Sequence, residues 1–571
     1  MYRWTNGWII HRYDHPSLMT SFPAAIEQAV RSALGSAAGA GSIPKLSDTV
    51  FVVERPRDRD HGDWATNIAL VAAKQAGIAP RDLAALVVEH LPEVPYLAST
   101  DIAGPGFINF TLASGWYLEV LARAAMGGPD HARGDQRAER IQIEFVSSNP
   151  NGPLHIGHGR GGVIGDVIAN ALDYAGHPVS REYYYNDAGV QMDRYAASLE
   201  ALYLKGNGID ADFPEDGYHG AYVGEWAEEL VAEHGDSLVN LEDRRDRIRQ
   251  WGLERAMLEI EETLELARVS FDQWFSETTL HESGDVDRSI EVLRQRGHVY
   301  EDEGAVWFRT TEFGDEKDRV LVKSDGEYTY IAPDVAYHRD KFERGFDRAI
   351  NVWGADHHGY IPRMKAAVEA LGYEPDRLEV LINQMVNVSR AGAPVRMSMR
   401  TGEFISFREV LEEVGTDATR FHLAAFSPDT TINFDLEAAK AQSMDNPVYY
   451  LQYAHARMCS LETFAVERGV VRQPIDDVDL SLLDHPAESA LLREADRLGE
   501  EIAEAARHRA PHRVASYGTD FATAFHRFYS ECRVVVDDPS VTQARLWLIA
   551  ASKNVILAVL GVLGLSAPET M

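Results

Sequence analysis

The order of hydrophobic and polar residues divides the chain into segments with different predicted secondary structure. Between residues 19 and 112, apolar positions recur at helical spacing in two segments and follow a strand-like pattern in two others. These segments are, in chain order, FPAAIEQAVRSAL, TVFVVERP, NIALVAAKQAG and FINFTLA. The pattern predicts a small α+β module over residues 19–112, and residues 1–18 are interpreted as an N-terminal extension.

Residues 135–440 alternate apolar, strand-like runs with helical patterns, which is typical of βαβ units and a parallel sheet. The predicted strands are IQIEFVSS, AVWFRT, RVLVKS, YTYIA, AINVWG and EVLINQMVNV. The first of them leads into a helix predicted from Pro153 to Ala175, with Gly176 just beyond its end. Charged helical patterns follow, so a helical insertion is expected at about residues 190–310.

From residue 441 to residue 571 nearly every segment has an amphipathic helical pattern, which predicts an all-α bundle. The apolar run VILAVLGVLGL, from Val555, is shorter than the roughly 20 residues of a membrane-spanning helix. We interpret this run as a buried terminal helix and expect no membrane contact.

The length, the net charge and the cysteine count each add to this picture. A chain of 571 residues is too long for one hydrophobic core, and about three or four domains are expected. The formal net charge of −34 repels polyanions, so a nucleic-acid partner would need a local basic face. The two cysteines, Cys459 and Cys532, are too few for a disulfide framework or a cysteine zinc site, which fits a reducing cytoplasm.

The segment NPNGPLHIGHGRGG, residues 149–162, contains two histidines among many glycines and allows three interpretations. A metal site would need more ligands than His155 and His158, and no Cys-rich or His-rich segment lies nearby, so no metal is predicted. A dinucleotide-binding loop is the second interpretation, because three glycines spell GxGxxG and Glu182 follows 20 residues later. However, the predicted strand ends near Val146, which would place these glycines inside the helix instead of in the turn before it.

Glycines inside a helix cost about 1 kcal/mol each relative to alanine, so their presence needs a physical reason. The glycines concerned are Gly157, Gly159, Gly161, Gly162 and Gly165. One reason is close packing of the helix on the sheet. The other, and the third interpretation of the segment, is that a nucleotide base lies on the bare turn with its phosphates near the helix N-terminus and the imidazoles.

Three short motifs resemble those of class I aminoacyl-tRNA synthetases. HIGH at 155–158 is similar to the first signature of that class, RMSMRTG at 396–402 resembles its mobile KMSKS loop, and WGADHHGY at 353–360 resembles the segment that holds the ATP ribose. Longer segments resemble arginyl-tRNA synthetases from Met19 to the C-terminus. They are EFVSSNPNGPLHIGHGRGG, YYYNDAGVQM, GDWATNIAL, DNPVYYLQYAHARMCS and HRFYSECRVVV with the apolar C-terminal segment ARLWLIAASKNVILAVLGVLGLSAPETM.

This resemblance implies a multidomain α/β fold. A Rossmann-like parallel-sheet catalytic domain at 135–440 carries the insertion, and the α+β module at 19–112 contacts tRNA. The all-α bundle at 441–571 is expected to bind the anticodon. The implied reaction activates L-arginine with ATP and transfers the arginyl group to tRNA(Arg), with Mg²⁺ accompanying ATP. The resemblance also implies a monomer in the cytoplasm.

The resemblance assigns site residues by their positions in the matching motifs. Arginine is expected to be bound by Glu144, Ser147, Asn149, His158, Glu277, Tyr330, Asp334 and His357. ATP is expected to be bound by His155, Gly157, His158, Gly354, Asp356, Met385 and Val386. The catalytic groups are expected to be His155, His158, Arg396, Ser398 and Arg400. Carboxylates suit a guanidinium because it presents five donors in one plane. The tRNA is expected to contact Tyr449, Tyr453, Arg457, Tyr529 and Arg533, because aromatic and basic groups suit unpaired bases and phosphates.

One position departs from the pattern of the family. Relatives often carry a lysine after the serine of the mobile loop, whereas this chain has Met399. The charge that clamps the phosphates is therefore expected from Arg396 or Arg400. Three interpretations stay open at this point: an active arginine–tRNA ligase, a specialised or tRNA-independent arginine-activating paralogue, and a catalytically impaired tRNA-binding relative. An unrelated nicotinamide oxidoreductase is a more distant fourth.

Overall fold

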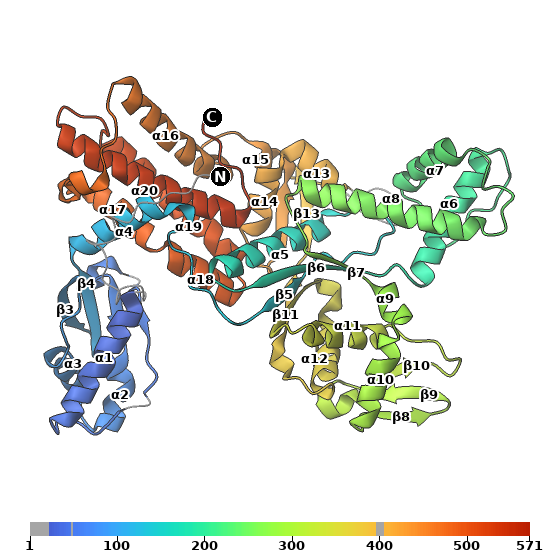
Figure 1. The fold of residues 1–571 in the computed structure, drawn as a ribbon, viewed down its shortest axis with the longest axis horizontal. Helices are drawn as coiled ribbons and strands as arrows, with labels where there is room; N and C mark the ends of the chain where they lie inside the picture. The colour runs from blue at the N-terminus through green and yellow to red at the C-terminus, as the bar shows by residue number, and fades with distance from the viewer. Residues whose placement is uncertain (1–21, 47–48, 57, 396–404) are drawn as a thin grey trace, which may run out of the picture. The chain divides into compact units, whose positions relative to one another are not determined.

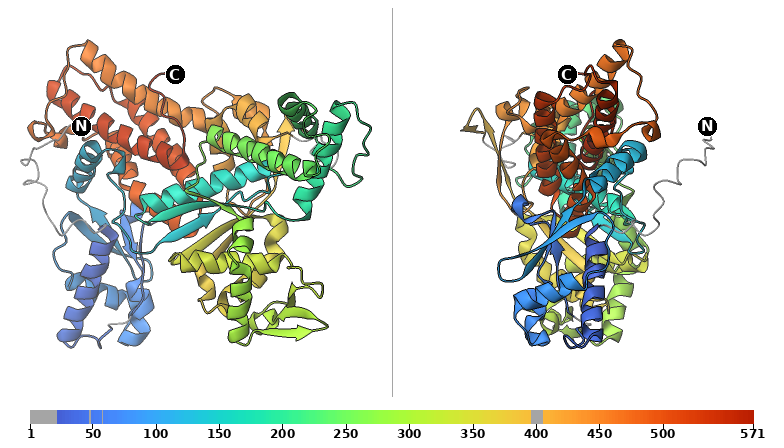
Figure 2. Two further views of the ribbon diagram at one scale, coloured as in Figure 1. Left: turned by 45° about the vertical axis from the view of Figure 1, so that its right-hand side comes forward. Right: turned by 90° about the vertical axis from the view of Figure 1, so that its left-hand side faces the viewer.

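The computed structural model describes residues 22–46, 49–56, 58–395 and 405–571. The chain divides into two compact units at Leu121 and Ala122. Figure 1 shows the ribbon with its elements labelled, and Figure 2 shows two further views. Each unit is described by itself below.

The N-terminal unit combines helices with a small antiparallel sheet, as the α+β prediction required. Its helices are α1 (Phe22–Gly39), α2 (Ile68–Ala76) and α3 (Pro80–Glu89). Its sheet has the order β1 (Val53–Glu54), β2 (Trp64–Thr66), β4 (Phe107–Leu112) and β3 (Leu97–Ala103). The strand predicted at 49–56 is shorter than expected because only Val53 and Glu54 pair with β2.

The second unit is built on a five-stranded parallel sheet, which confirms the predicted parallel sheet. The strand order is β12 (Leu378–Asn383), β11 (Arg348–Gly354), β5 (Ile141–Glu144), β6 (Val179–Tyr185) and β7 (Gln273–Ser276). Every neighbouring pair is parallel, so all five carboxyl ends meet at one edge. The order reverses direction between β5 and β11, and open α/β sheets bind ligands at such a switch point.

Helices cover the parallel sheet. Helix α5 (Ile156–Tyr174) follows β5 and packs against β5, β6 and β11, while α11 (Ile331–Glu343) and α12 (Ile361–Ala370) pack on β11 and β12. The core around α11 and α12 includes Ala332, Met364 and Leu378, which are fully buried. Helix α5 starts three residues later than predicted and ends before Gly176, whose φ of 92° suits glycine.

Three helices form a separate cluster between β6 and β7. They are α6 (Val190–Gly206), α7 (Ala221–His234) and α8 (Arg244–Leu266), and they share a core that includes Tyr195, Trp226 and Ile248. Strand β7 then rejoins the parallel sheet, so the later part of the 190–310 region is not continuously helical. That part continues with α9 (Glu277–Glu282) and α10 (Asp285–Gln295).

Four predicted strands differ from the observed structure in their sheet, their type or their length. AVWFRT and RVLVKS form β9 (Ala305–Phe308) and β10 (Arg319–Val322), which pair with β8 (Val299–Asp302) in an antiparallel sheet of their own. YTYIA is not a strand, because α11 begins at Ile331. EVLINQMVNV divides into β12 of the parallel sheet and β13 (Val386–Arg390), which pairs with β14 (Ala393–Pro394) and β15 (Ile432–Asp435).

The end of the chain is helical, as predicted. Three short helices, α13 (Phe407–Val414), α14 (Thr416–Ala424) and α15 (Leu436–Lys440), lead into the bundle. The bundle consists of α16 (Pro447–Glu467), α17 (Pro486–Asp496), α18 (Leu498–His508), α19 (Pro511–Glu531) and α20 (Pro539–Leu563).

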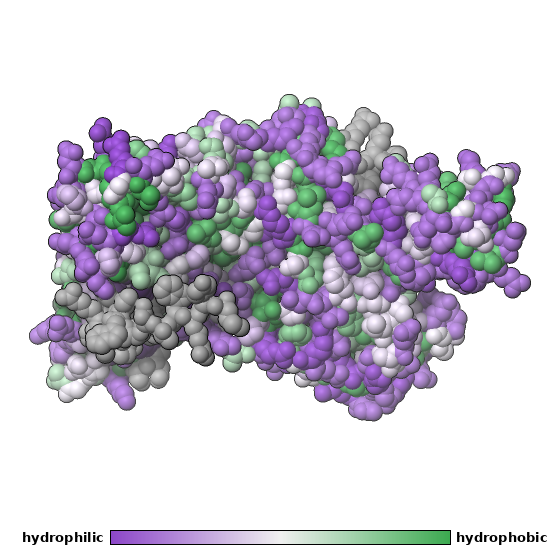
Figure 3. Space-filling model, turned by 45° about the horizontal axis from the view of Figure 1, so that its top comes forward, coloured by the Kyte–Doolittle hydropathy of each residue, from purple (hydrophilic) through white to green (hydrophobic). Residues whose placement is uncertain are grey.

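Helix α20 contains the apolar C-terminal run. By length and composition it could cross a membrane, but 78% of its most apolar stretch is buried among the other helices, as in a core helix. On the face drawn in Figure 3, hydrophobic side chains are scattered in patches between hydrophilic ones.

Candidate active site

The loop after β5 brings several predicted residues to the carboxyl edge of the sheet. Val146 and Ser147 have φ values of 68° and 42°, in the left-handed region that a β-branched valine rarely adopts. The Ser147 hydroxyl accepts a hydrogen bond from the backbone N–H of Tyr184 at 3.2 Å. Strained backbone of this kind clusters at functional sites.

The glycines of α5 give that helix close contacts with rings and with the strained loop. A β-carbon at Gly159 would lie 2.3 Å from the ring of Phe407, and one at Gly165 would lie 2.3 Å from the ring of Phe145. A β-carbon at Gly162 would lie 3.2 Å from Val146. Close packing therefore explains these three glycines, whereas Gly161 has only an ordinary contact, 3.5 Å from Asn383.

We expect Gly165→Ala to lower the free energy of unfolding by about 1 to 3 kcal/mol, because the added methyl group overpacks Phe145. Gly161→Ala is the matched control on the same helix. It gains helix propensity of about 1 kcal/mol without a clash, so it should be neutral or stabilising. Urea unfolding of both variants measures the difference, and equal stability of the two would contradict the packing explanation.

His155 and His158 form a stacked pair at the start of α5. The rings lie 3.6 Å apart, and the His155 imidazole caps the helix by accepting from the backbone N–H of His158 at 3.2 Å. Burial lowers the pKa of His155 and lowers that of His158 to about 3, so both are neutral near pH 7. Within the described chain, Nδ1 of His158 is buried without a hydrogen-bond partner. A neutral imidazole with a free buried nitrogen can donate to a phosphate oxygen.

Three carboxyl groups predicted to bind arginine gather near the carboxyl ends of β5, β6 and β7. Glu144 ends β5 and Glu277 begins α9, and these two side chains are buried. Asp334, in the first turn of α11, is half-buried. The Tyr184 hydroxyl donates to Glu277 at 2.5 Å, and the Tyr360 hydroxyl donates to Asp334.

The electrostatics of this cluster favour a cation. The pKa of Asp334 is raised to about 7, mainly by burial and in part by the neighbouring charges of Glu277 and Glu144. Burial also raises the pKa of Glu277. Carboxyl groups with such raised pKa values are stabilised in their charged form by a bound cation, and a guanidinium can bond to several of them at once.

Other predicted arginine-binding residues lie at the rim of this cluster. Tyr330 precedes α11 four residues before Asp334, and its ring is 74% exposed. His357 is exposed in the turn after β11, and the Asn149 side chain donates to Gln191 at 2.8 Å. In this conformation these three side chains make no hydrogen bond to Glu144, Glu277 or Asp334.

The predicted ATP-binding residues follow the ends of β11 and β12. Gly354 ends β11. A β-carbon added at this position would lie 2.6 Å from the carboxylate of Asp356, whose side chain is exposed. Burial lowers the pKa of His155, and the negative charge of Asp356 partly opposes that lowering. Met385 is exposed between β12 and β13, and Val386 is buried. The predicted catalytic residues Arg396, Ser398 and Arg400 lie outside the described residues.

The structure argues against a dinucleotide-binding loop in this segment. The GxGxxG glycines lie inside α5, and Glu182, the expected ribose ligand of a dinucleotide site, is fully buried in bonds with Arg344 and Tyr337. Among residues 22–46, 49–56, 58–395 and 405–571, no group of three His, Cys, Asp or Glu side chains is arranged to hold a metal ion.

Four residues of the site were missed by the sequence analysis. Asn383, at the end of β12, donates to the carbonyl of Gly157 at 3.1 Å and so links β12 to the first turn of α5. Tyr360 and Tyr184 bond the carboxyl groups, and Lys341 bonds Glu144 at 2.5 Å. A lysine seven residues after Asp334 lies on the same helix face, which was the available signal for Lys341.

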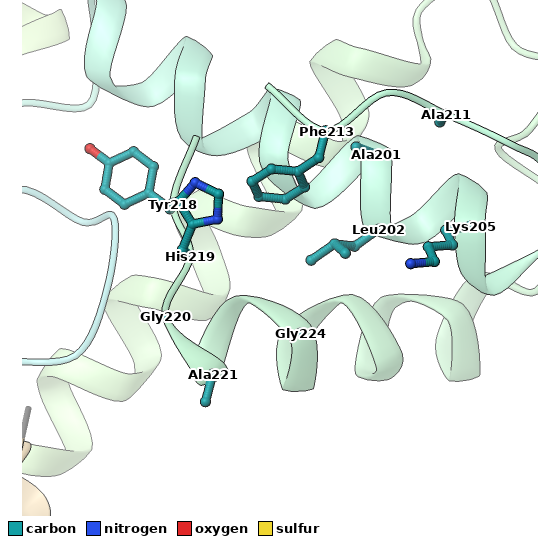
Figure 4. A pocket seen from close by; sticks show the side chains of 10 residues that line it. All are labelled: Ala201, Leu202, Lys205, Ala211, Phe213, Tyr218, His219, Gly220, Ala221 and Gly224. Atoms are coloured by element: carbon teal, nitrogen blue, oxygen red, sulfur yellow. The ribbon is translucent and has the colours of Figure 1, made fainter. Parts of the chain in front are cut away.

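Residues of the α6–α8 region form hydrogen bonds with the loop before α5. The Tyr222 hydroxyl donates to the carbonyl of Asn151 at 2.8 Å, and the Tyr218 hydroxyl accepts from the Asn151 side chain at 3.0 Å. A β-carbon at Gly152 would lie 2.8 Å from the Tyr222 oxygen. Tyr218 also lines a cleft of about 370 Å³ between α6 and α7, where Figure 4 shows the rings of Phe213 and His219.

The residues expected to contact nucleic acid form a ladder of rings and one guanidinium on the bundle. The rings of Tyr449 and Tyr453 on α16 are stacked 6.0 Å apart. Arg457 lies 4.4 Å over Tyr453 and 4.2 Å over Tyr529 of α19. We call Tyr449, Tyr453, Arg457 and Tyr529 the tyrosine–arginine ladder. Arg533 is exposed on the loop after α19.

Comparisons with known proteins agree over most of the chain. Residues 24–112 match the family model described as the arginyl tRNA synthetase N terminal domain, and residues 124–443 match that of tRNA synthetases class I (R), catalytic domain. Residues 451–571 match the DALR anticodon binding domain.

Relatives with these names align over nearly their full length. The arginine–tRNA ligase of Moorella thermoacetica is 46% identical over 95% of this chain and 97% of its own. That of Listeria welshimeri is 48% identical over 96% of this chain and 98% of its own. The solved arginyl-tRNA synthetase of Thermus thermophilus shares the fold, with a TM-score of 0.73 at 23% identity over 95% of this chain and all of that one.

Proposed function

The chain belongs to the arginyl-tRNA synthetase family of class I aminoacyl-tRNA synthetases, and on this basis we propose which of its residues perform each part of the reaction. The protein is a ligase that activates arginine with ATP and transfers the arginyl group to tRNA. The observation that best supports our assignment of residues is the cluster of three carboxyl groups beside the stacked histidines at one edge of the sheet.

Arginine binds with its guanidinium against Asp334 and Glu277, and Tyr330 closes over the cation from the start of α11. Glu144, Ser147 and Asn149 hold the amino and carboxylate groups, and His357 completes the site. The raised pKa of Asp334 supports this assignment, because ionising a poorly solvated carboxyl group without a cation is costly and a planar guanidinium compensates that cost.

Activation joins the arginine carboxylate to the α-phosphorus of ATP. A carboxylate oxygen attacks that phosphorus, the bond to the bridging β-phosphate oxygen breaks, and pyrophosphate leaves. His155 and His158 donate N–H bonds to the phosphate oxygens while charge accumulates on them, and Gly157 lets the nucleotide approach the first turn of α5. Gly354, Asp356, Met385 and Val386 hold the ribose and base.

We also propose that Arg396 or Arg400, near Ser398, clamps the β- and γ-phosphates in place of the lysine that this chain lacks. ATP enters as its Mg²⁺ complex. In the second step a terminal ribose hydroxyl of tRNA(Arg) attacks the arginyl carbonyl, the bond from that carbonyl to the adenylate phosphate breaks, and AMP leaves with the hydroxyl proton passing to its phosphate. We infer a monomer in the cytoplasm, and the burial of α20 within the bundle is consistent with a protein that does not enter a membrane.

ATP–pyrophosphate exchange with each amino acid, with and without tRNA, tests the activation step. We expect exchange with arginine and with no other amino acid. Comparing the rates with and without tRNA establishes whether activation depends on tRNA. Exchange with another amino acid would overturn the pocket assignment. No exchange with any amino acid, together with retained tRNA binding, would identify an impaired relative.

The tyrosine–arginine ladder is proposed to bind unpaired bases and phosphates of tRNA. Arg457→Ala removes the guanidinium held between two rings, so kcat/KM for tRNA should fall about 10- to 100-fold, as for the loss of one stacked base contact. Aminoacylation kinetics measure this effect. The control is Arg468→Ala, which removes a guanidinium over Phe464 at the end of the same helix. Equal losses in both variants would show that only overall charge matters.

A further inference from the structure

Lys341 is a buried cation that no part of the reaction uses directly. Its side chain is fully buried, and its ammonium group donates to Glu144 at 2.5 Å and to the Asn351 side chain at 2.8 Å. The ammonium also lies 4.3 Å from the centre of the Tyr337 ring. A buried ammonium is costly unless carboxylate and hydrogen-bond partners compensate it, and these three contacts do so.

The contacts of Lys341 extend to the backbone of the proposed guanidinium-binding residue. The Asn351 amide bonds Nε2 of His338 at 2.9 Å, and Nδ1 of His338 donates to the carbonyl of Asp334 at 2.8 Å. Asp334, His338 and Lys341 are spaced four and three residues apart and so lie on one face of α11. A continuous set of hydrogen bonds thus joins Glu144 on β5, Asn351 on β11 and Asp334 on α11.

Charged and titratable groups face Asp334 from several elements. They are Tyr360 from the turn after β11, Glu277 from α9, Glu144 from β5, Tyr184 from β6 and Lys341 from α11. The pKa of Asp334 is raised to about 7, mainly by burial and in part by the two glutamates, although the Tyr360 bond and the Lys341 ammonium act to lower it. Burial and, to a smaller extent, the same ammonium lower the pKa of His338. That imidazole is therefore neutral and donates a hydrogen bond to the Asp334 carbonyl.

We propose that Lys341 is a positioning residue that sets the charge of the arginine pocket: by neutralising Glu144 from within the fold, it leaves Asp334 and Glu277 ionised for the guanidinium. The inference rests on the proposed arginine pocket. Lys341 itself touches no substrate, and it acts through Glu144, Asn351 and His338. Without its charge, three neighbouring carboxyl groups cannot all ionise near neutral pH.

The pH dependence of kcat/KM for arginine tests this role, because it reports ionisations of the free enzyme. Arginine binds the ionised form of Asp334, so kcat/KM should fall as the pH drops below about 7, where this carboxylate takes up a proton. In Lys341→Met the pKa of Asp334 rises. The midpoint of the pH dependence of kcat/KM for arginine should therefore move up by about one pH unit, and kcat/KM at pH 7 should fall about tenfold or more. KM for ATP should stay within about twofold of the parent value.

Arg339→Met is the matched control. It removes a positive charge from the same helix, but Arg339 bonds Glu343 and Ser289 instead of the pocket, so its midpoint should equal that of the parent protein. Should Lys341→Met fail to fold, Asn351→Asp places a second carboxylate beside the same ammonium and should move the midpoint in the same direction.

Two outcomes separate this inference from the proposed function. If Asp334→Asn abolishes arginine use while the Lys341 or Asn351 variant keeps the parental midpoint, the charge-setting role is wrong and the pocket stands. If Asp334→Asn leaves arginine use unchanged, the pocket assignment fails, and the inference fails with it.

Discussion

Asp334→Asn should reduce kcat/KM for arginine by about 30-fold to several thousandfold, while KM for ATP stays near its parental value. The amide keeps the shape of the carboxylate but removes the negative charge that faces the guanidinium. Breaking one side of such a desolvated charge pair costs about 2 to 5 kcal/mol, which converts to that range of fold-changes. Steady-state exchange kinetics with arginine and ATP varied separately measure it.

The same substitution should not destabilise the free protein, which distinguishes lost binding from misfolding. The folded-state pKa of Asp334, about 7, lies above its ordinary value of 3.8, so ionising this carboxyl group opposes folding. This cost grows as the pH rises from about 4 to 7 and is complete above 7. Asp334→Asn should therefore raise Tm at pH 8 in the absence of arginine, and the gain should shrink as the pH falls toward 4. A lowered Tm at pH 8, or an unchanged kcat/KM for arginine, would remove Asp334 from the pocket.

His158→Ala should slow adenylate formation by about 10²- to 10³-fold, with smaller effects on KM for either substrate. Its N–H is proposed to stabilise phosphate oxygens in the transition state, and removing one preorganised donor of this kind has an effect of that size. Because the pKa of His158 is lowered to about 3, the imidazole is already neutral, and its own ionisation should not appear in the pH–rate profile above pH 5. Rapid-quench measurement of adenylate formation tests the prediction.

Two variants separate a donor from a packing residue at this position. His158→Asn keeps an N–H donor and should recover part of the lost rate. His131→Ala is the matched control, because His131 is likewise half-buried with a lowered pKa but lies in the segment that bonds Tyr174 at the other end of α5. A parental rate in His158→Ala would show that the imidazole has only a structural role.

Local patterns were sufficient for much of the fold. The helix after β5, strands β5, β9, β10 and β11, and the helices of the C-terminal bundle follow from apolar periodicity and from glycines at helix ends. They could be predicted because each depends on residues close together in the chain. The fold class and the position of His155 and His158 at a helix start rest on the same kind of information.

Strand partners could not be predicted in this way. AVWFRT and RVLVKS have the composition of sheet strands, yet they pair with β8 in an antiparallel sheet apart from the parallel one. EVLINQMVNV reads as one strand, but its two halves pair with β11 and β15. Strand preference is a property of a segment, whereas pairing depends on residues far away in the sequence.

The sequence by itself determined the family, the reaction and the candidate residues for binding arginine and ATP. These could be identified because they depend on contiguous motifs and on side-chain chemistry. Only the tertiary structure showed that the rings of Phe145 and Phe407 occupy the space left by two glycines of α5. Only the tertiary structure brought Lys341 to Glu144, 197 residues away in the chain, which is the contact on which the proposed charge-setting role of Lys341 rests. The physical reason is that burial and charge coupling depend on distance in space, and a pKa shift arises only after folding has excluded water from groups that are remote in the chain.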